Sequence, residues 1–134
     1  MRILKYAAVA AAVCMIAAPA HASYEDDLYI LAHVMCGEAE GCGRDMLLSV
    51  GSVVLNRVSD SRFPDTVAEV VFQPGQYACT WDGNYYREPS EETWEIAAEL
   101  LEDGPAIDES VVWQAEFIQG YGVYDVIGNM YFCY

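Results

Sequence analysis

Apolar residues recur at helical spacing through the first half of the chain. The first predicted helix begins after Ser23, a good N-cap followed by acidic residues that suit a helix start, and ends at about Cys36, before Gly37. Its apolar stripe consists of Leu28, Leu31, Val34 and Met35. A second helix is predicted over about residues 44–58, and Gly51 within it allows a neighbouring helix to pack closely.

Two further helices are predicted on either side of a loop. Thr66 can cap a short helix that runs through about Phe72. The string Pro89-Ser90-Glu91-Glu92 opens a longer helix that ends at Gly104-Pro105. Residues 73–89 are predicted as a loop because their Pro-Gly and Asp-Gly pairs suit tight turns.

The pattern changes from helical to extended near the C-terminus. Residues 111–116 and 129–134 are rich in β-branched and aromatic side chains, which predicts two strands. The strands can pair as an antiparallel hairpin across a glycine-bearing connection, residues 117–128. The predicted fold class is therefore α+β, with helices first and a small antiparallel sheet near the C-terminus.

The N-terminus has the features of a secretory signal peptide. Basic residues precede an apolar run, residues 6–18, and the Ala20-x-Ala22 spacing suits cleavage after Ala22. A permanent membrane anchor takes roughly 20 apolar residues, more than this run supplies. We therefore expect a signal peptide at residues 1–22, one domain at residues 23–134, a secreted or periplasmic location, and no stable membrane insertion after cleavage.

The charge of the chain limits its partners. Two of the six basic residues and none of the 21 acidic ones precede residue 23, so cleavage changes the formal net charge from -15 to -17. Such a surface repels nucleic acid and anionic membranes, and we expect neither as a partner. It also opposes binding to an anionic cell wall, and solubility is the simplest explanation for it.

Cysteine usage agrees with export. Cys14 lies within the signal peptide, and an even number of cysteines in a small exported domain predicts two disulfides. Four cysteines allow three pairings, of which we favour Cys42 with Cys79 and Cys36 with Cys133. A zinc site is the alternative, but the spacing lacks a C-x-x-C pair and the mature part has one histidine, so we expect no metal and no cofactor.

Glu38 is the main candidate for catalysis. It stands among small residues in the string Cys36-Gly37-Glu38-Ala39-Glu40-Gly41-Cys42, where glycines let a bulky substrate approach the backbone. No nucleophile elbow, phosphate-binding loop or dinucleotide fingerprint is present, which leaves carboxylate chemistry. The competing interpretation is a solvated residue at a helix end. Glu40 and Glu116 are weaker carboxylate candidates, and no spacing between catalytic carboxylates can be inferred.

The loop between the third and fourth predicted helices is rich in aromatic residues. Flat aromatic faces and amide groups suit pyranose rings with hydroxyl and acetamido groups. The residues of this predicted sugar-binding wall are Tyr77, Trp81, Tyr85, Tyr86, Gln76 and Asn84. The alternative is that these side chains pack the loop onto the core.

Several strings occur in a particular order along residues 23–134. They are Gly37-Glu38-Ala39, Val50-Gly51-Ser52-Val53-Val54-Leu55-Asn56-Arg57-Val58, Arg62-Phe63-Pro64, Val70-Val71-Phe72-Gln73-Pro74-Gly75-Gln76-Tyr77 and Ile127-Gly128-Asn129. In these strings the chain resembles the cell wall hydrolase family typified by the spore cortex-lytic enzyme SleB. The V-V-L-N-R and Q-P-G-Q-[FY] strings are the most specific.

The resemblance implies a lysozyme-like domain that cleaves peptidoglycan glycan strands between N-acetylmuramic acid and N-acetylglucosamine. It implies Glu38 as the catalytic acid of a lytic transglycosylase, whose 1,6-anhydro product forms without a second carboxylate. Substrate contacts carried over from it are Asn56, Gln76, Tyr77 and Trp81, and Asn84 joins them from the loop. The alternatives are a muramidase that uses water and a non-catalytic glycan-binding module. We expect a monomer located at the cell wall.

Overall fold

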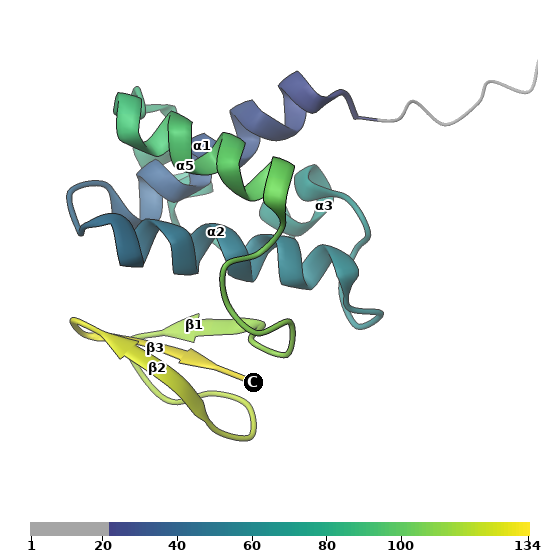
Figure 1. The fold of residues 1–134 in the computed structure, drawn as a ribbon, viewed down its shortest axis with the longest axis vertical. Helices are drawn as coiled ribbons and strands as arrows, with labels where there is room; N and C mark the ends of the chain where they lie inside the picture. Colours follow the sequence, from purple (N-terminus) through teal and green to yellow (C-terminus); the bar gives the residue numbers. More distant parts are fainter. Residues whose placement is uncertain (1–21) are drawn as a thin grey trace, which may run out of the picture.

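The computed structural model of the protein describes residues 22–134 (Figure 1). The predicted signal peptide, except for Ala22, lies outside the described residues. Within the described part of the chain, no helix is both long enough and apolar enough to cross a membrane.

Helix α1 (Tyr24–Ala39) begins as predicted. The Ser23 hydroxyl accepts from the backbone N–H of Asp26, whose carboxylate accepts in turn from the Ser23 backbone N–H, which forms a capping box. The helix continues through Gly37 to Ala39, so the predicted end at Cys36 is wrong. Gly37 keeps a helical backbone, and the positive-φ glycine that follows α1 is Gly41.

Helix α2 (Arg44–Ser59) lies at the centre of the fold, with the sheet on one side and α1 and α5 (Glu91–Asp103) on the other (Figure 1). Gly51 makes this packing possible, because a Cβ placed there would lie 2.5 Å from Cδ1 of Leu100 and 2.9 Å from Sδ of Met35. The close helix approach predicted at this glycine is confirmed.

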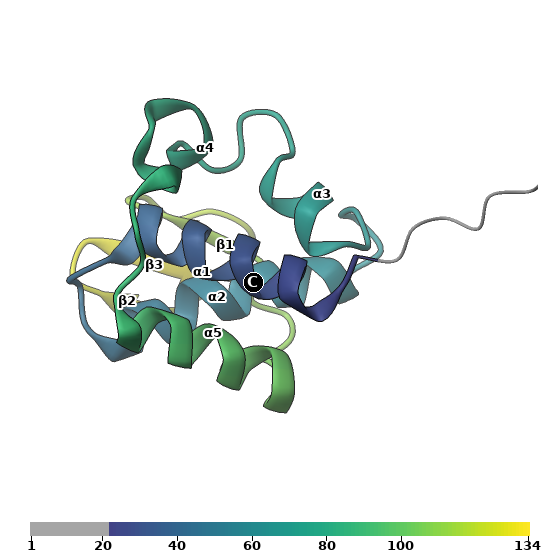
Figure 2. The same cartoon turned by 90° about the horizontal axis from the view of Figure 1, so that it is seen from above.

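Helix α3 (Val67–Val71) and the segment after it lie on the opposite side of α1 from α5 (Figure 2). Thr66 caps α3 as predicted. The predicted loop over residues 73–89 contains a short helix, α4 (Cys79–Asp82), and a 3-10 helix, η1 (Asn84–Tyr86). Helix α4 packs against the last turn of α1, where the backbone N–H of Cys79 donates to the Glu38 carboxyl group.

The sheet has three strands, β1 (Trp113–Ala115), β2 (Val123–Ile127) and β3 (Met130–Cys133), in the order β1-β3-β2. The antiparallel pairing of the two predicted strands is confirmed, with Trp113 opposite Cys133. Strand β2 lies within the predicted connection and was missed, because its first four residues are exposed and show no alternation. The α+β class with helices first is confirmed.

Candidate active site

Glu38 lies in the last turn of α1, facing α4. Its carboxyl group is half-buried, and Oε1 accepts a hydrogen bond from the backbone N–H of Cys79 at 3.5 Å. The close approach of α4 depends on Gly37, because a Cβ placed there would lie 2.5 Å from Cβ and 2.8 Å from Sγ of Cys79. A glycine one residue before the acid therefore lets α4 reach the carboxyl group.

The surroundings of Glu38 favour its protonated form. Burial raises the pKa of Glu38, hydrogen bonds from the thiol and backbone of Cys79 lower it, and the negative charge of Asp82 raises it, with a net increase. The same proximity acts on Cys79, since burial and the charge of Glu38 raise the pKa of its thiol. The thiol therefore stays protonated beside the Glu38 carboxyl group.

Tyr77 is close to both Glu38 and the buried Arg57. Its side chain is only 2% exposed, and its hydroxyl has no hydrogen-bond partner within the described part of the chain. Burial raises the pKa of Tyr77 to about 12, with Arg57 lowering it and Glu38 raising it. The aromatic ring contacts the Arg57 guanidinium, with Cζ 5.4 Å from the ring centroid.

Arg57 holds Gln76 next to Tyr77. This arginine is 3% exposed, and it donates from Nε to the Val112 carbonyl at 2.8 Å and from Nη1 to Oε1 of Gln76 at 3.2 Å. The guanidinium also lies over the rings of Phe63 and Trp113. Neither ion pair within residues 22–134 includes Arg57.

Sequence reasoning missed the role of Arg57. The signal was present, because Arg57 follows Val50, Val53 and Val54 at helical spacing and so falls on the buried stripe of α2. A cation on a buried stripe indicates a specific set of partners.

Some residues of the predicted sugar-binding wall are buried and others are exposed. Tyr77 and Tyr85 belong to the hydrophobic core, as in the alternative interpretation that these side chains pack the loop onto the core. Trp81 is 62% exposed, Tyr86 is exposed, and Asn84 is half-buried. The side chains of this segment that remain available to a ligand are therefore those of Trp81, Tyr86, Asn84 and the exposed Gln76.

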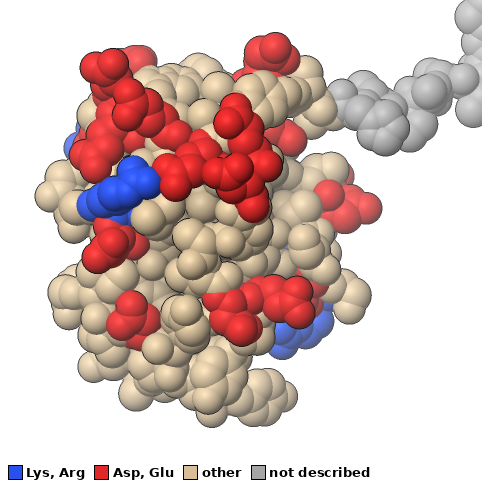
Figure 3. Space-filling view, in the orientation of Figure 1, with Lys and Arg blue, Asp and Glu red and all other residues tan. Residues whose placement is uncertain are grey.

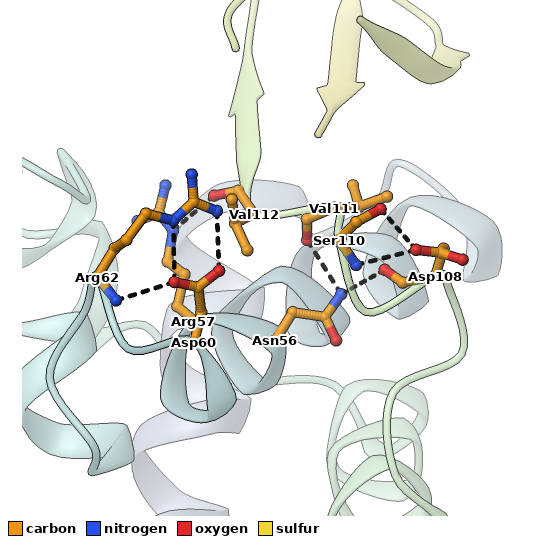
Figure 4. Close-up of polar contacts among 8 residues, drawn as sticks. All are labelled: Asn56, Arg57, Asp60, Arg62, Asp108, Ser110, Val111 and Val112. Atoms are coloured by element: carbon orange, nitrogen blue, oxygen red, sulfur yellow. Dashed lines mark hydrogen bonds and ion pairs between the residues drawn. The ribbon is translucent and has the colours of Figure 1, made fainter. Parts of the chain in front are cut away.

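The side chain of Asn56 bonds to the protein backbone and is not available to a ligand. It is buried, and its Nδ2 donates to the carbonyls of Asp108 at 2.8 Å and Val111 at 3.0 Å (Figure 4). The side chain ties the end of α2 to the segment that leads into β1. Figure 4 shows Arg57 next to it, making the equivalent bond to Val112.

The two weaker carboxylate candidates also have structural partners. Glu40 accepts from the Ser90 backbone N–H at 3.0 Å and from the Thr93 hydroxyl at 2.6 Å, which joins the end of α1 to the start of α5. Glu116 accepts from Nδ2 of Asn129 at 2.8 Å, next to the turn between β2 and β3.

The predicted disulfides are absent from the described residues, where the four cysteines are free. The predicted pairings, Cys42 with Cys79 and Cys36 with Cys133, are therefore wrong for this structure. Each thiol has different surroundings: Cys36 contacts the Arg87 carbonyl, Cys42 is exposed, Cys79 touches Glu38, and Cys133 lies within β3. Residues 22–134 contain no group of three or more His, Cys, Asp or Glu side chains suited to a metal ion.

A family model described as Cell Wall Hydrolase matches residues 43–133. The chain belongs to the cell wall hydrolase family. The matched range begins five residues after Glu38, and it includes Arg57, Gln76 and Tyr77. The resemblance inferred from the sequence strings is thereby confirmed.

Several named relatives of this cell wall hydrolase are similar over part of their length. The spore cortex-lytic enzyme of Oceanobacillus iheyensis is 31% identical over 77 residues, which are 58% of this chain and 28% of that protein. The spore cortex-lytic enzyme of Bacillus subtilis is 28% identical over 66% of this chain and 29% of that protein. Cell wall hydrolase CwlJ of Halalkalibacterium halodurans is 35% identical over 56% of each chain. The match thus spans less than a third of the spore cortex-lytic enzymes.

The fold of this cell wall hydrolase matches two solved structures. The catalytic domain of the germination-specific lytic transglycosylase SleB from Bacillus anthracis aligns with a TM-score of 0.71 and 23% identity, over 84% of this chain and 97% of that domain. The SleB catalytic domain of Bacillus cereus aligns with a TM-score of 0.70 and 24% identity, over 87% of this chain and 94% of that domain. These matches confirm the predicted fold.

Proposed function

We propose that this cell wall hydrolase cleaves the glycan strand of peptidoglycan between N-acetylmuramic acid and N-acetylglucosamine, with Glu38 as the catalytic acid and base. The observation that carries the proposal is the half-buried Glu38 carboxyl, whose pKa is raised by burial, in a fold shared with a lytic transglycosylase domain. A general acid needs a pKa close to the working pH, and burial supplies this shift.

The reaction proceeds as a lytic transglycosylation. Protonated Glu38 gives its proton to the glycosidic oxygen as the bond from that oxygen to C1 of N-acetylmuramic acid breaks. The 6-hydroxyl of the same sugar then bonds to C1 and returns its proton to Glu38, which gives a 1,6-anhydro end. Water is not consumed, and the carboxyl group ends the cycle protonated.

Two carboxylates are candidates for a second catalytic group, Asp82 and Glu40, and both have hydrogen-bond partners. Oδ1 of Asp82, whose charge acts on Glu38, accepts from the Asn84 backbone N–H at 2.9 Å. A retaining or inverting hydrolase uses two carboxyl groups on opposite sides of the scissile bond. Both oxygens of Glu40, the nearest acid in the sequence, accept hydrogen bonds from the start of α5. Glu38 therefore acts as both acid and base.

Substrate contacts in this proposal come from the segment between α3 and α5. Gln76 offers an amide held by Arg57, Trp81 offers an exposed ring, and Asn84 offers a second amide. Tyr77 is buried, so it contributes to this site by packing next to Gln76 and Arg57 rather than by touching the sugar. Asn56 contributes indirectly by fixing the end of α2.

The protein acts outside the cytoplasm in this proposal. Residues 1–22 direct export as a signal peptide, and the domain works as a monomer at the cell wall. The substrate is the glycan strand, with no nucleic acid partner, in agreement with the formal net charge of -15.

Digestion of purified peptidoglycan followed by mass spectrometry of the muropeptides tests the proposal. We expect anhydro-ended products from the wild type and none from Glu38→Gln. Products heavier by one water would identify a hydrolase instead. No products from a folded wild type that still binds peptidoglycan would identify a non-catalytic glycan-binding module. Full activity of Glu38→Gln would exclude Glu38 as the acid.

A further inference from the structure

The C-terminal part of the chain exposes an unusual number of large apolar side chains. Those within residues 113–134 are Phe117, Ile118, Tyr121, Val123, Tyr124, Val126 and Tyr134, and we call them the C-terminal apolar surface. Tyr121 is 92% exposed and Phe117 is 62% exposed. Exposed apolar residues that gather in one region indicate a binding surface, whereas scattered ones need no explanation.

Charge is distributed unevenly between this region and the helices. Of the 21 acidic residues, only Glu116 and Asp125 lie within residues 113–134, and that range contains no Lys or Arg. Figure 3 shows acidic side chains crowded over the helical part of the molecule and sparser over the sheet. An anionic polymer therefore meets the least repulsion at the C-terminal apolar surface.

The surface continues into a concave region. A cavity of about 510 Å³ lies at the junction of β2 with α2, and Tyr124 and Val126 belong to both the cavity wall and the C-terminal apolar surface. Leu48 and Ile107 add apolar wall, Ser49 adds a hydroxyl, and the carboxylates of Asp45 and Asp125 also line the cavity. Apolar side chains beside hydrogen-bonding groups suit a ligand that has flat C–H faces and hydroxyl groups.

The loop that presents Tyr121 is held in place by the C-terminus. The Tyr121 backbone N–H donates to the Tyr134 carbonyl at 2.6 Å, and the Tyr134 N–H donates to the Gly122 carbonyl at 3.1 Å. Gly120 has a φ of 65° and no room for a Cβ against Trp113. The exposed ring is therefore presented by ordered backbone, which lowers the entropy cost of binding.

We propose that the C-terminal apolar surface is an accessory docking surface for the glycan strand of peptidoglycan, separate from the residues around Glu38. The inference rests on the proposed function, which supplies the substrate. Tyrosine and phenylalanine rings stack on the C–H faces of sugars, and the phenolic hydroxyls bond to sugar hydroxyls. A second copy of the chain is the less favourable occupant, because it brings its own net charge of -15, whereas the charges of peptidoglycan lie on its peptide branches.

Sedimentation with insoluble peptidoglycan tests the docking surface without turnover. The full chain carrying Glu38→Gln is compared with the same chain carrying Phe117→Ser and Tyr121→Ser in addition. We expect about tenfold weaker binding, equivalent to about 1.4 kcal/mol, with little salt dependence because stacking is not ionic. Glu38→Gln with Tyr24→Ser is the matched control, since Tyr24 is an exposed tyrosine on α1, and it should bind as Glu38→Gln does.

The outcomes separate this inference from the proposed function. Equal binding by the Phe117→Ser/Tyr121→Ser chain, no binding by the Glu38→Gln chain, or a dimer that those two substitutions dissociate would each overturn the docking surface. Turnover by the wild type is measured independently. If the wild type shows no turnover while the two substitutions weaken binding, the docking surface stands and the proposed chemistry fails.

Discussion

The backbone N–H of Cys79 donates to the carboxyl group of Glu38 at 3.5 Å, and the Cys79 thiol acts on the same carboxyl group. Both groups of Cys79 favour the ionised carboxylate, while burial favours the protonated acid and has the larger effect. The position of α4 therefore adjusts the pKa of Glu38 through two opposing influences. A residue that has to act as an acid and then as a base needs such a balance.

Removing the thiol should move the pH dependence of activity. In Cys79→Ala the pKa of Glu38 rises further, because one hydrogen bond to the ionised form is lost, so the fall in kcat/KM on the alkaline side should occur at higher pH. Cys79→Ser keeps a donor at this position and should resemble the wild type. The pH profile of kcat/KM is the measurement, and an unchanged or opposite shift in Cys79→Ala would contradict the hydrogen bond from the thiol.

Neutralising Glu38 should stabilise the protein at neutral pH. The folded pKa of Glu38 is raised, so wild-type stability is fully present below the ordinary carboxyl pKa and declines as the pH rises through the raised folded value. Glu38→Gln avoids this decline. Thermal unfolding midpoints should coincide in acid and diverge in favour of Glu38→Gln as the pH rises. A Glu38→Gln variant that is less stable than the wild type at neutral pH would indicate that the ionised carboxylate is favoured by its surroundings.

Gly37 should accept no side chain while Cys79 is present. In Gly37→Ala the new Cβ meets Cβ and Sγ of Cys79, which we expect to cost about 1–3 kcal/mol by overpacking. Activity should fall as well, because α4 is displaced from Glu38. The double variant Gly37→Ala/Cys79→Gly removes the clashing atoms and should regain part of the stability. Urea unfolding of the four proteins gives the coupling energy, and simple additivity would show that the clash is not the cause.

The elements predicted correctly are those specified by local interactions. Ser23, Thr66 and Ser90 each cap a helix through a bond to a residue three positions later, and such signals can be read from the sequence. Strand β2 could not be predicted in this way, because pairing with β3 rather than burial of its own side chains defines it. Gly37 was interpreted as a helix end, but contact with Cys79 is what requires a glycine there.

The candidate site was predictable in part. Glu38 was chosen from its small neighbours; its carboxyl group is half-buried, unlike that of a solvated helix-end residue, and its role as the catalytic acid stays a prediction. The division of the aromatic loop into buried Tyr77 and Tyr85 and exposed Trp81 and Tyr86 depends on how residues 73–89 fold over α1, which no local pattern specifies. The cysteine pairing could not be predicted either, because it depends on which thiols the fold brings together, and the four thiols are free in the structure.

Glu40 should stabilise the junction between α1 and α5. Burial raises its pKa, but the hydrogen bonds from Ser90 and Thr93 outweigh this and lower it overall, so its contribution is present above the ordinary carboxyl pKa and is lost as the pH falls through the lowered folded value. Glu40→Gln should lose about 1–3 kcal/mol at neutral pH. Glu95→Gln, an exposed carboxylate in α5, is the control and should change stability little. Equal stability of both variants in urea unfolding would show that the junction does not need the charge.

Arg57 should matter for both stability and substrate binding, because it joins the sheet to the segment that carries Gln76. Arg57→Lys keeps the charge but loses the planar guanidinium, which donates to the Val112 carbonyl and to Gln76 at the same time. A lysine also stacks less well on the three aromatic rings that surround the guanidinium. We expect a loss of about 1–3 kcal/mol in the free energy of unfolding, since the buried Val112 carbonyl is left without its donor.

The kinetic effect distinguishes positioning from simple destabilisation. At a temperature where Arg57→Lys is fully folded, KM for glycan should rise while kcat changes less, because Glu38 is intact but Gln76 is no longer fixed. Arg62→Lys is the matched control, since Arg62 is exposed and its pair with Asp60 lies on the surface, where such pairs contribute about 0–1 kcal/mol. If Arg57→Lys kept the wild-type KM and lost only thermal stability, the arginine would serve the fold alone, and Gln76 would have no part in holding the substrate.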